Sequence, residues 1–181
     1  VWTGLGTQTF SISGNGIEYL KNSNKVFDCI YIDPSRRRDS KGKVFYLNDC
    51  LPNVTEHLDL FFKHSKTILI KASPMLDISI GLGELKWVKE VHVVAVDNDV
   101  KELLFLLEAN FEGDVTIKTI NIIKKNNQSF QFKVSEEKST ESSYSLPKNY
   151  LYEPNSTIMK AGGFNIISKI HNIDKLHKHS H

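Results

Sequence analysis

The sequence predicts an α/β protein whose first part is a parallel sheet with helices on its faces. Two apolar runs, at residues 26–32 and 67–70, suit strands that are covered on both sides, and a polar stop follows each run. Apolar residues at helical spacing over 51–62 separate the two runs. Strands that alternate with helices imply right-handed crossovers and therefore a parallel sheet.

The residues before the first run predict a short strand at 10–13, a loop at 14–16 and a helix that begins at Ile17. The strand at 26–32 is expected to end at Asp33, because Pro34 follows and removes a ladder donor.

The helix over 51–62 has Asn48 or Asp49 as its candidate N-cap, and Pro52 is tolerable in a first turn. The rest of the chain is predicted to contain a strand at 91–96, a helix at 100–107 and strands at 115–122 and 130–134. A polar loop at 136–145 follows, and then a helix at 156–170 that is interrupted at Gly162-Gly163.

Composition excludes few classes of protein. Of the 181 residues, 40% are hydrophobic and 24% charged, and the net charge of +2 does not by itself identify a nucleic-acid binder. No apolar run approaches the roughly 20 residues that span a bilayer, and no basic leader precedes an apolar block. Cys29 and Cys50 are interpreted as buried free thiols. These features together predict a cytoplasmic protein.

The segment most suited to chemistry is Asp33-Pro34-Ser35-Arg36-Arg37-Arg38, directly after the first buried strand. In open α/β sheets the ligand crevice lies outside the carboxyl ends of the strands. A carboxylate there can make polar contacts to a ligand, and arginines can bind phosphates or stack on bases. The alternative is that Asp-Pro only ends the strand and the arginines are solvated. The turn at 14–16, expected beside the same crevice, favours a binding edge.

Residues 13–20 and 27–37 resemble the middle of class I S-adenosylmethionine-dependent methyltransferases. More narrowly, they resemble the bacterial branch with an Asp-Pro-small-Arg-Arg signature and a C-terminal THUMP-like domain. Residues 150–164, together with Leu176-His177, resemble that THUMP-like region, and 80–123 resemble a small ferredoxin-like piece.

This resemblance implies three parts of the chain. Residues 1–79 would be the C-terminal half of the methyltransferase domain, an incomplete Rossmann-like sheet. Residues 80–123 would be the ferredoxin-like piece, and 124–181 the THUMP-like α+β region. The glycine-rich cofactor turn of such enzymes has no counterpart in residues 1–181, so we expect the chain to be part of a longer protein and to bind the cofactor poorly alone.

The resemblance also assigns roles. Asn15 stands where these enzymes hold an acidic residue that bonds the cofactor's adenine amino group, and its carbonyl oxygen can accept there. Asp33 and Pro34 match the first two positions of the Asp/Asn-Pro-Pro-aromatic motif, which holds a target nitrogen toward the methyl sulfonium. Ser35 replaces the second proline of the motif, and Arg36 replaces the aromatic residue that would stack on a base. The flat guanidinium group of an arginine could stack on the base instead.

The expected function is therefore methyl transfer from S-adenosyl-L-methionine to RNA, either tRNA or rRNA. The catalytic residues are predicted to be Asp33 and Pro34, and the cofactor residues Asn15, Gly16 and Asp33. Substrate contacts are predicted for Ser35, Arg36, Arg37, Arg38, Lys41 and Lys71.

A second hypothesis is a non-catalytic RNA-binding module on a degenerate methyltransferase fold. No membrane contact is expected. No metal is expected either, because His171, His177, His179 and His181 are interpreted as an exposed tail without an acidic or cysteine cluster.

Overall fold

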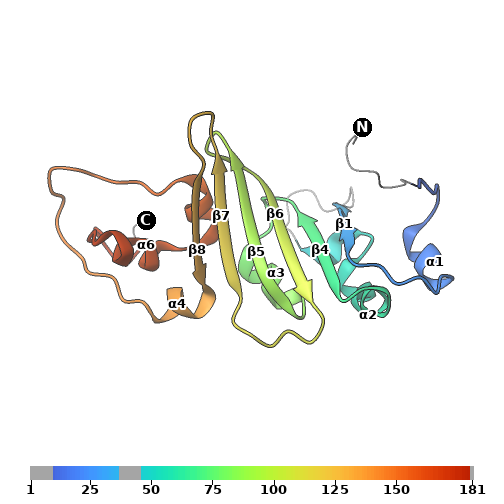
Figure 1. Ribbon diagram of the computed structural model, residues 1–181. Helices are drawn as coiled ribbons and strands as arrows, with labels where there is room; N and C mark the ends of the chain where they lie inside the picture. The colour runs from blue at the N-terminus through green and yellow to red at the C-terminus, as the bar shows by residue number, and fades with distance from the viewer. Residues whose placement is uncertain (1–9, 37–45, 180–181) are drawn as a thin grey trace.

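The computed structural model describes residues 10–36 and 46–179 (Figure 1). The first half contains α1 (Gly16–Lys21), β1 (Ile30–Ile32), β2 (Ser35–Arg36), the 3-10 helix η2 (Leu47–Asp49), β3 (Cys50–Leu51), α2 (Val54–His64), β4 (Thr67–Ala72) and α3 (Ile78–Glu84). The second half contains β5 (Val88–Val96), β6 (Asp99–Glu108), β7 (Thr116–Ile122), β8 (Gln128–Lys133), α4 (Val134–Ser139), α5 (Ser156–Ala161) and α6 (Phe164–His171).

The main sheet is mixed rather than purely parallel. Its six strands run in the order β1-β4-β6-β5-β7-β8, and only β1·β4 and β5·β7 are parallel pairs. The pairs β4·β6, β5·β6 and β7·β8 are antiparallel, and β2·β3 form a separate two-stranded ribbon. The α/β class is therefore confirmed, whereas the parallel arrangement predicted for its first part holds only for the pair β1·β4.

The predicted helix at 100–107 is wrong, because these residues form β6. β5 and β6 make a hairpin whose turn residues Asp97 and Asn98 have φ angles of 47° and 63°, the left-handed conformation of hairpin turns. The backbone N–H of Asn98 donates to Oδ1 of Asn121 at 2.9 Å. Leucines on both faces of the strand gave the helical spacing, so periodicity alone favoured the wrong element.

The core lies on one face of this sheet. Every second side chain of the central strands is buried there, including Ile70, Val93 and Phe105. Helix α5 packs on β5, β6 and β7, and Gly81 of α3 allows close approach, since a Cβ added there would be 2.6 Å from the Phe105 ring. Figure 1 shows α3 behind β5 and β6.

The opposite face, which we call the open face, carries half-buried side chains such as Leu69, Leu104 and Leu106. Among the helices that the structure describes, none crosses in front of β5, β6 or β7 on this face in Figure 1. The two faces of the sheet therefore differ in cover among the described residues.

Several local predictions in the first half need correction. Residues 10–13 are not a strand, and the first buried strand covers only 30–32, because no neighbouring strand pairs with the residues before it. The N-cap of α2 is Asn53, so neither Asn48 nor Asp49 holds that position. Residues 47–51 instead form the 3-10 helix η2 and the strand β3.

The two cysteines differ in burial. Cys50 is buried as predicted, but Cys29 is exposed, because it precedes the paired part of the strand. The two cysteines are not joined in a disulfide. No helix in the described ranges has the length and hydrophobicity that crossing a bilayer requires.

The C-terminal residues form three short helices. The predicted loop at 136–145 is in part helix α4, because Glu136 accepts the Lys133 N–H at 2.7 Å and closes its first turn. The predicted break between α5 and α6 is confirmed at Gly162, whose φ of 72° ends α5 in a left-handed cap. Glu137 of α4 then accepts the Ile166 N–H at 2.8 Å and joins α4 to the start of α6.

Candidate active site

Three charged side chains from three adjacent strands meet at one edge of the sheet. Asp33 follows the last residue of β1, Lys71 lies near the end of β4, and Glu102 lies near the start of β6. The Nζ atom of Lys71 is 2.8 Å from Oδ2 of Asp33 and 3.6 Å from Oε2 of Glu102. We call this group the strand-end triad.

The sheet register explains why these three residues meet. Ile32 pairs with Ile70 in parallel, so the next residues, Asp33 and Lys71, lie side by side. Lys71 alternates with buried neighbours and therefore points to the open face. Asp33 remains accessible, with 51% of its side chain exposed, whereas the Lys71 side chain is 28% exposed.

The two carboxylates of the triad favour the protonated form of Lys71. The hydrogen bond to Asp33 raises the pKa of Lys71, and the charge of Glu102 raises it further, while burial opposes the shift. The lysine therefore stays protonated at neutral pH and fixes one oxygen of the Asp33 carboxylate. Within the described residues Oδ1 of Asp33 has no hydrogen-bond partner, so this atom can accept an N–H or O–H from a ligand.

Asn15 has a structural role that the sequence did not reveal. Its Oδ1 accepts the N–H of Ile17 at 2.9 Å and of Glu18 at 3.4 Å, which caps helix α1. No hydrogen bond or ion pair between described residues joins Asn15 to Asp33, and Figure 1 shows α1 beyond β1 at the end of the sheet. The carbonyl oxygen expected to accept from adenine is thus occupied by the helix. Gly16 begins α1 with open space around it.

The residues after Pro34 are described only in part. Ser35 donates its Oγ hydrogen to the Leu51 carbonyl oxygen at 3.4 Å, and the Arg36 backbone pairs with Cys50. The ribbon β2·β3 thus fixes where the arginine segment leaves the sheet edge. Arg37, Arg38 and Lys41, which were predicted to contact substrate, lie outside the described residues. The roles predicted for all these residues stay predictions.

Glu102 and Tyr31 belong to the site but were missed in the sequence. Glu102 was assigned to a helix, whereas the turn residues Asp97-Asn98, directly after the β-branched run at 91–96, indicate a hairpin that would have placed it on a strand. Tyr31 is 56% exposed and pairs with Leu69, so it points to the open face beside the triad.

The described residues contain no group of three or more His, Cys, Asp or Glu side chains that could hold a metal. The rings of His177 and His179 lie 5.3 Å apart, and His181 is outside the described part of the chain.

Comparisons with known proteins add to this geometry. A family model described as a ferredoxin-like domain matches residues 150–181, which lie within the predicted region 124–181 and outside 80–123. The boundaries of the three predicted parts stay predictions. No curated protein matches the chain.

A solved structure described as a putative methyltransferase from Porphyromonas gingivalis W83 matches with a TM-score of 0.71 and 34% sequence identity. The match covers 83% of this chain and 37% of that protein, so the chain spans a little over a third of its relative's length. Most of this chain therefore has a fold shared with a protein described as a putative methyltransferase.

Proposed function

We propose that this chain is part of an S-adenosyl-L-methionine-dependent methyltransferase that acts on RNA, either tRNA or rRNA. The observation that carries the proposal is the exposed Asp33 carboxylate after β1, one oxygen of which pairs with Lys71 while the other has no partner among the described residues, in a chain 34% identical to a protein described as a putative methyltransferase. Strand carboxyl ends are where α/β sheets bind their ligands.

Asp33 would act by orientation. Its Oδ1 accepts a hydrogen bond from the acceptor's N–H or O–H group, which turns the acceptor lone pair toward the transferred carbon. Lys71 keeps the carboxylate in place, and the Pro34 carbonyl can accept a second hydrogen. S-adenosyl-L-methionine, when bound, supplies the electrophilic methyl group.

The fit of the cofactor to the expected residues is partial. Asp33 and Gly16 present an exposed carboxylate and open space. Asn15 offers its amide N–H groups rather than its capped carbonyl oxygen, so any contact to adenine reverses the donor and acceptor that the resemblance implied. The remainder of a cofactor site would be contributed by residues outside this chain.

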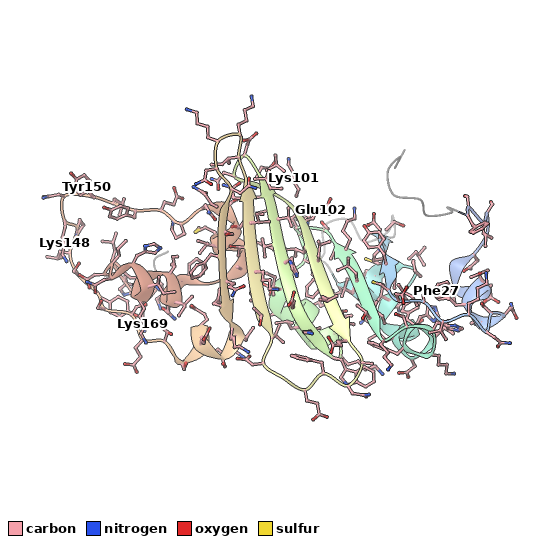
Figure 2. All side chains as sticks on the ribbon, viewed as in Figure 1. Phe27, Lys101, Glu102, Lys148, Tyr150 and Lys169 are labelled. Atoms are coloured by element: carbon pink, nitrogen blue, oxygen red, sulfur yellow. The ribbon has the colours of Figure 1, made fainter. Side chains whose placement is uncertain are left out.

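The choice of RNA rests on charge at the same sheet edge. The exposed pair Lys124 and Lys125, in the turn between β7 and β8, lies at the edge that holds the triad, where Lys101 of β6 pairs with Asp99. Figure 2 shows Lys101 and Glu102 together at the upper end of the sheet. Lysines beside a strand-end site can contact phosphates of a long anionic substrate.

The second candidate, an RNA-binding module without catalysis, is favoured by the capped carbonyl of Asn15. Calorimetric titration of S-adenosyl-L-methionine into the full-length protein separates the two. Saturable binding, followed by transfer of radiolabelled methyl groups to purified tRNA or rRNA, supports the methyltransferase. Retention of RNA with no cofactor binding and no transfer would contradict it and support the module.

A further inference from the structure

Two rows of side chains cross β1, β4 and β6 on the open face of the sheet. The register of the strands places an apolar row there, which consists of Tyr31, Leu69 and Leu106. The next row, toward the carboxyl end of β1, consists of Asp33, Lys71 and Leu104. Residues two apart on a strand lie roughly 6–7 Å apart on the same face, so Tyr31 is the neighbour of Asp33 along its own strand.

The Tyr31 ring is available to a ligand. The residue is 56% exposed, and its side chain makes no hydrogen bond or ring contact with another described residue. Leu69 and Leu106 beside it are half-buried and form an apolar floor. The pKa of Lys71 is raised chiefly by its hydrogen bond to Asp33 and, more weakly, by Tyr31, so the Tyr31 phenol group lies near the ammonium group of the triad. A flat ring beside a carboxylate suits a planar group with a polar edge.

The charge of the triad favours one kind of acceptor in RNA. Its two carboxylates face one ammonium group, so the formal charge of the triad is negative. A ribose 2′-hydroxyl lies beside the backbone phosphates, which the carboxylates would repel. The N–H groups at the edge of a base lie farther from the phosphates, and they can donate to Oδ1 of Asp33. The triad therefore suits a base better than a ribose.

We propose that the methyl acceptor is an N–H group of an unpaired RNA base whose face lies on the Tyr31 ring while Asp33 holds its edge. Every base has a face that stacks on an aromatic ring, and a base inside a duplex cannot reach one. The motif that the chain resembles has an aromatic residue at position 36, where this chain has Arg36, so the aromatic contact comes from β1 instead. The inference rests on the proposed function, since it names the acceptor and the side chain that selects it.

The transfer step balances with the residues of this site. The lone pair of the base nitrogen forms the new bond to the methyl carbon, and the electron pair of the broken carbon–sulfur bond stays on the sulfur of the cofactor. The proton of the nitrogen passes to Oδ1 of Asp33 and then to water. Tyr31 takes no part in the bond changes and acts only by holding the base.

The first test locates the methyl group. The full-length protein is incubated with radiolabelled S-adenosyl-L-methionine and purified tRNA or rRNA, and acid hydrolysis then separates the bases from the ribose. We expect the label in the base fraction. Label that stays with the ribose would overturn the inference and leave the proposed methyltransferase function standing.

The second test removes the ring. Tyr31→Ala should lower kcat/KM for RNA about tenfold or more, which is the loss of one stacked base, while the KM for S-adenosyl-L-methionine stays within about twofold. Tyr31→Phe keeps the ring and should restore most of that loss. Tyr31→Leu keeps apolar volume without a flat ring and should resemble Tyr31→Ala at an unchanged Tm. The matched control is Tyr144→Ala, because Tyr144 is 52% exposed but lies far along the chain from the triad.

Full activity in Tyr31→Leu would show that the ring only packs and would overturn the inference, as would a raised KM for S-adenosyl-L-methionine at an unchanged KM for RNA. RNA binding without cofactor, followed by fluorescence anisotropy, separates the two proposals. Binding that Tyr31→Ala weakens about tenfold, in a protein that transfers no methyl group, would support the base contact and contradict the proposed function. Neither methyl transfer nor binding that depends on Tyr31 would contradict both.

Discussion

The strand-end triad and the C-terminal segment 146–154 are held in opposite ways. Asp33 and Lys71 meet because two parallel strands fix their register by backbone hydrogen bonds, above a core of fully buried side chains. Residues 146–154 make no backbone–backbone hydrogen bonds among the described residues. The difference teaches that the sheet edge has the rigid geometry that orienting an acceptor needs, whereas the strap, residues 146–154 between α4 and α5, is held by fewer backbone hydrogen bonds and can change conformation more easily.

Removing a core side chain under the triad should have the largest effect on stability. Phe105 is fully buried in β6, so Phe105→Ala should lower the free energy of unfolding by roughly 3–5 kcal/mol. Leu151→Ala on the strap should change it by less than about 0.5 kcal/mol, because that side chain is 78% exposed. Urea denaturation of both variants measures the contrast; equal losses would show that the strap belongs to the core.

Lys71→Met should separate orientation from folding. The variant keeps the apolar stem but removes the ammonium that holds Asp33, so we expect a roughly tenfold fall in the methyl-transfer kcat with little change in Tm. Lys86→Met is the matched control, since Lys86 also pairs with an exposed aspartate, Asp59, but away from the triad. A fall of the same size in both variants would argue against a positioning role for Lys71.

Gly162 tests the joint between α5 and α6. Its φ of 72° suits glycine, so Gly162→Ala should cost about 1 kcal/mol of stability although no neighbouring atom would clash with the new methyl group. Gly83→Ala, in helix α3 with equally open space, should be neutral or stabilise by up to about 1 kcal/mol. Thermal melts should therefore show a lower Tm for Gly162→Ala and an equal or higher Tm for Gly83→Ala, and a similar loss in both variants would contradict the backbone argument.

The smallest expected effect is an acid-dependent loosening of the strap. Hydrogen bonds from Lys148 and Ser143 lower the pKa of Asp174 from 3.8 to about 2. A carboxyl whose folded pKa is depressed stabilises the fold above its unfolded pKa, and that contribution is lost as the pH falls from 3.8 toward about 2. Pepsin should therefore cleave the strap faster at about pH 2 than at pH 4.

Asp174→Asn should show the fast cleavage already at about pH 4, whereas Asp59→Asn, which breaks an ion pair elsewhere, should leave strap cleavage unchanged. Cleavage that responds equally to both substitutions would mean that Asp174 does not anchor the strap.

Much of the fold could be predicted from periodicity, but the hairpin could not. The strand predicted at 67–70 and those around 115–122 and 130–134 are confirmed, because each alternates or forms a short buried run between polar stops. Residues 99–108 failed this reasoning, since leucines on both faces of β6 imitate a helical stripe. As β6 inserts between β4 and β5, that single error also hid the mixed order of the sheet.

The candidate site was predictable to the extent that it depended on where one strand ends. Pro34 placed Asp33 at the sheet edge from sequence alone. The partnership of Asp33 with Lys71 needed the register of two strands, and Glu102 needed the hairpin. The use of the Asn15 carbonyl in a helix cap agrees with the preference of asparagine for the N-cap position, a signal that the sequence contains but that the assignment to the cofactor displaced.

The most direct test of the account is methyl transfer from radiolabelled S-adenosyl-L-methionine to RNA by the full-length protein carrying Asp33→Ala. We predict a loss of at least about 100-fold in kcat with an unchanged Tm. Asp28→Ala, two residues before β1 and also exposed, should retain wild-type turnover. Equal turnover by the wild type and Asp33→Ala would contradict the assignment of the strand-end triad as the methyl-transfer site.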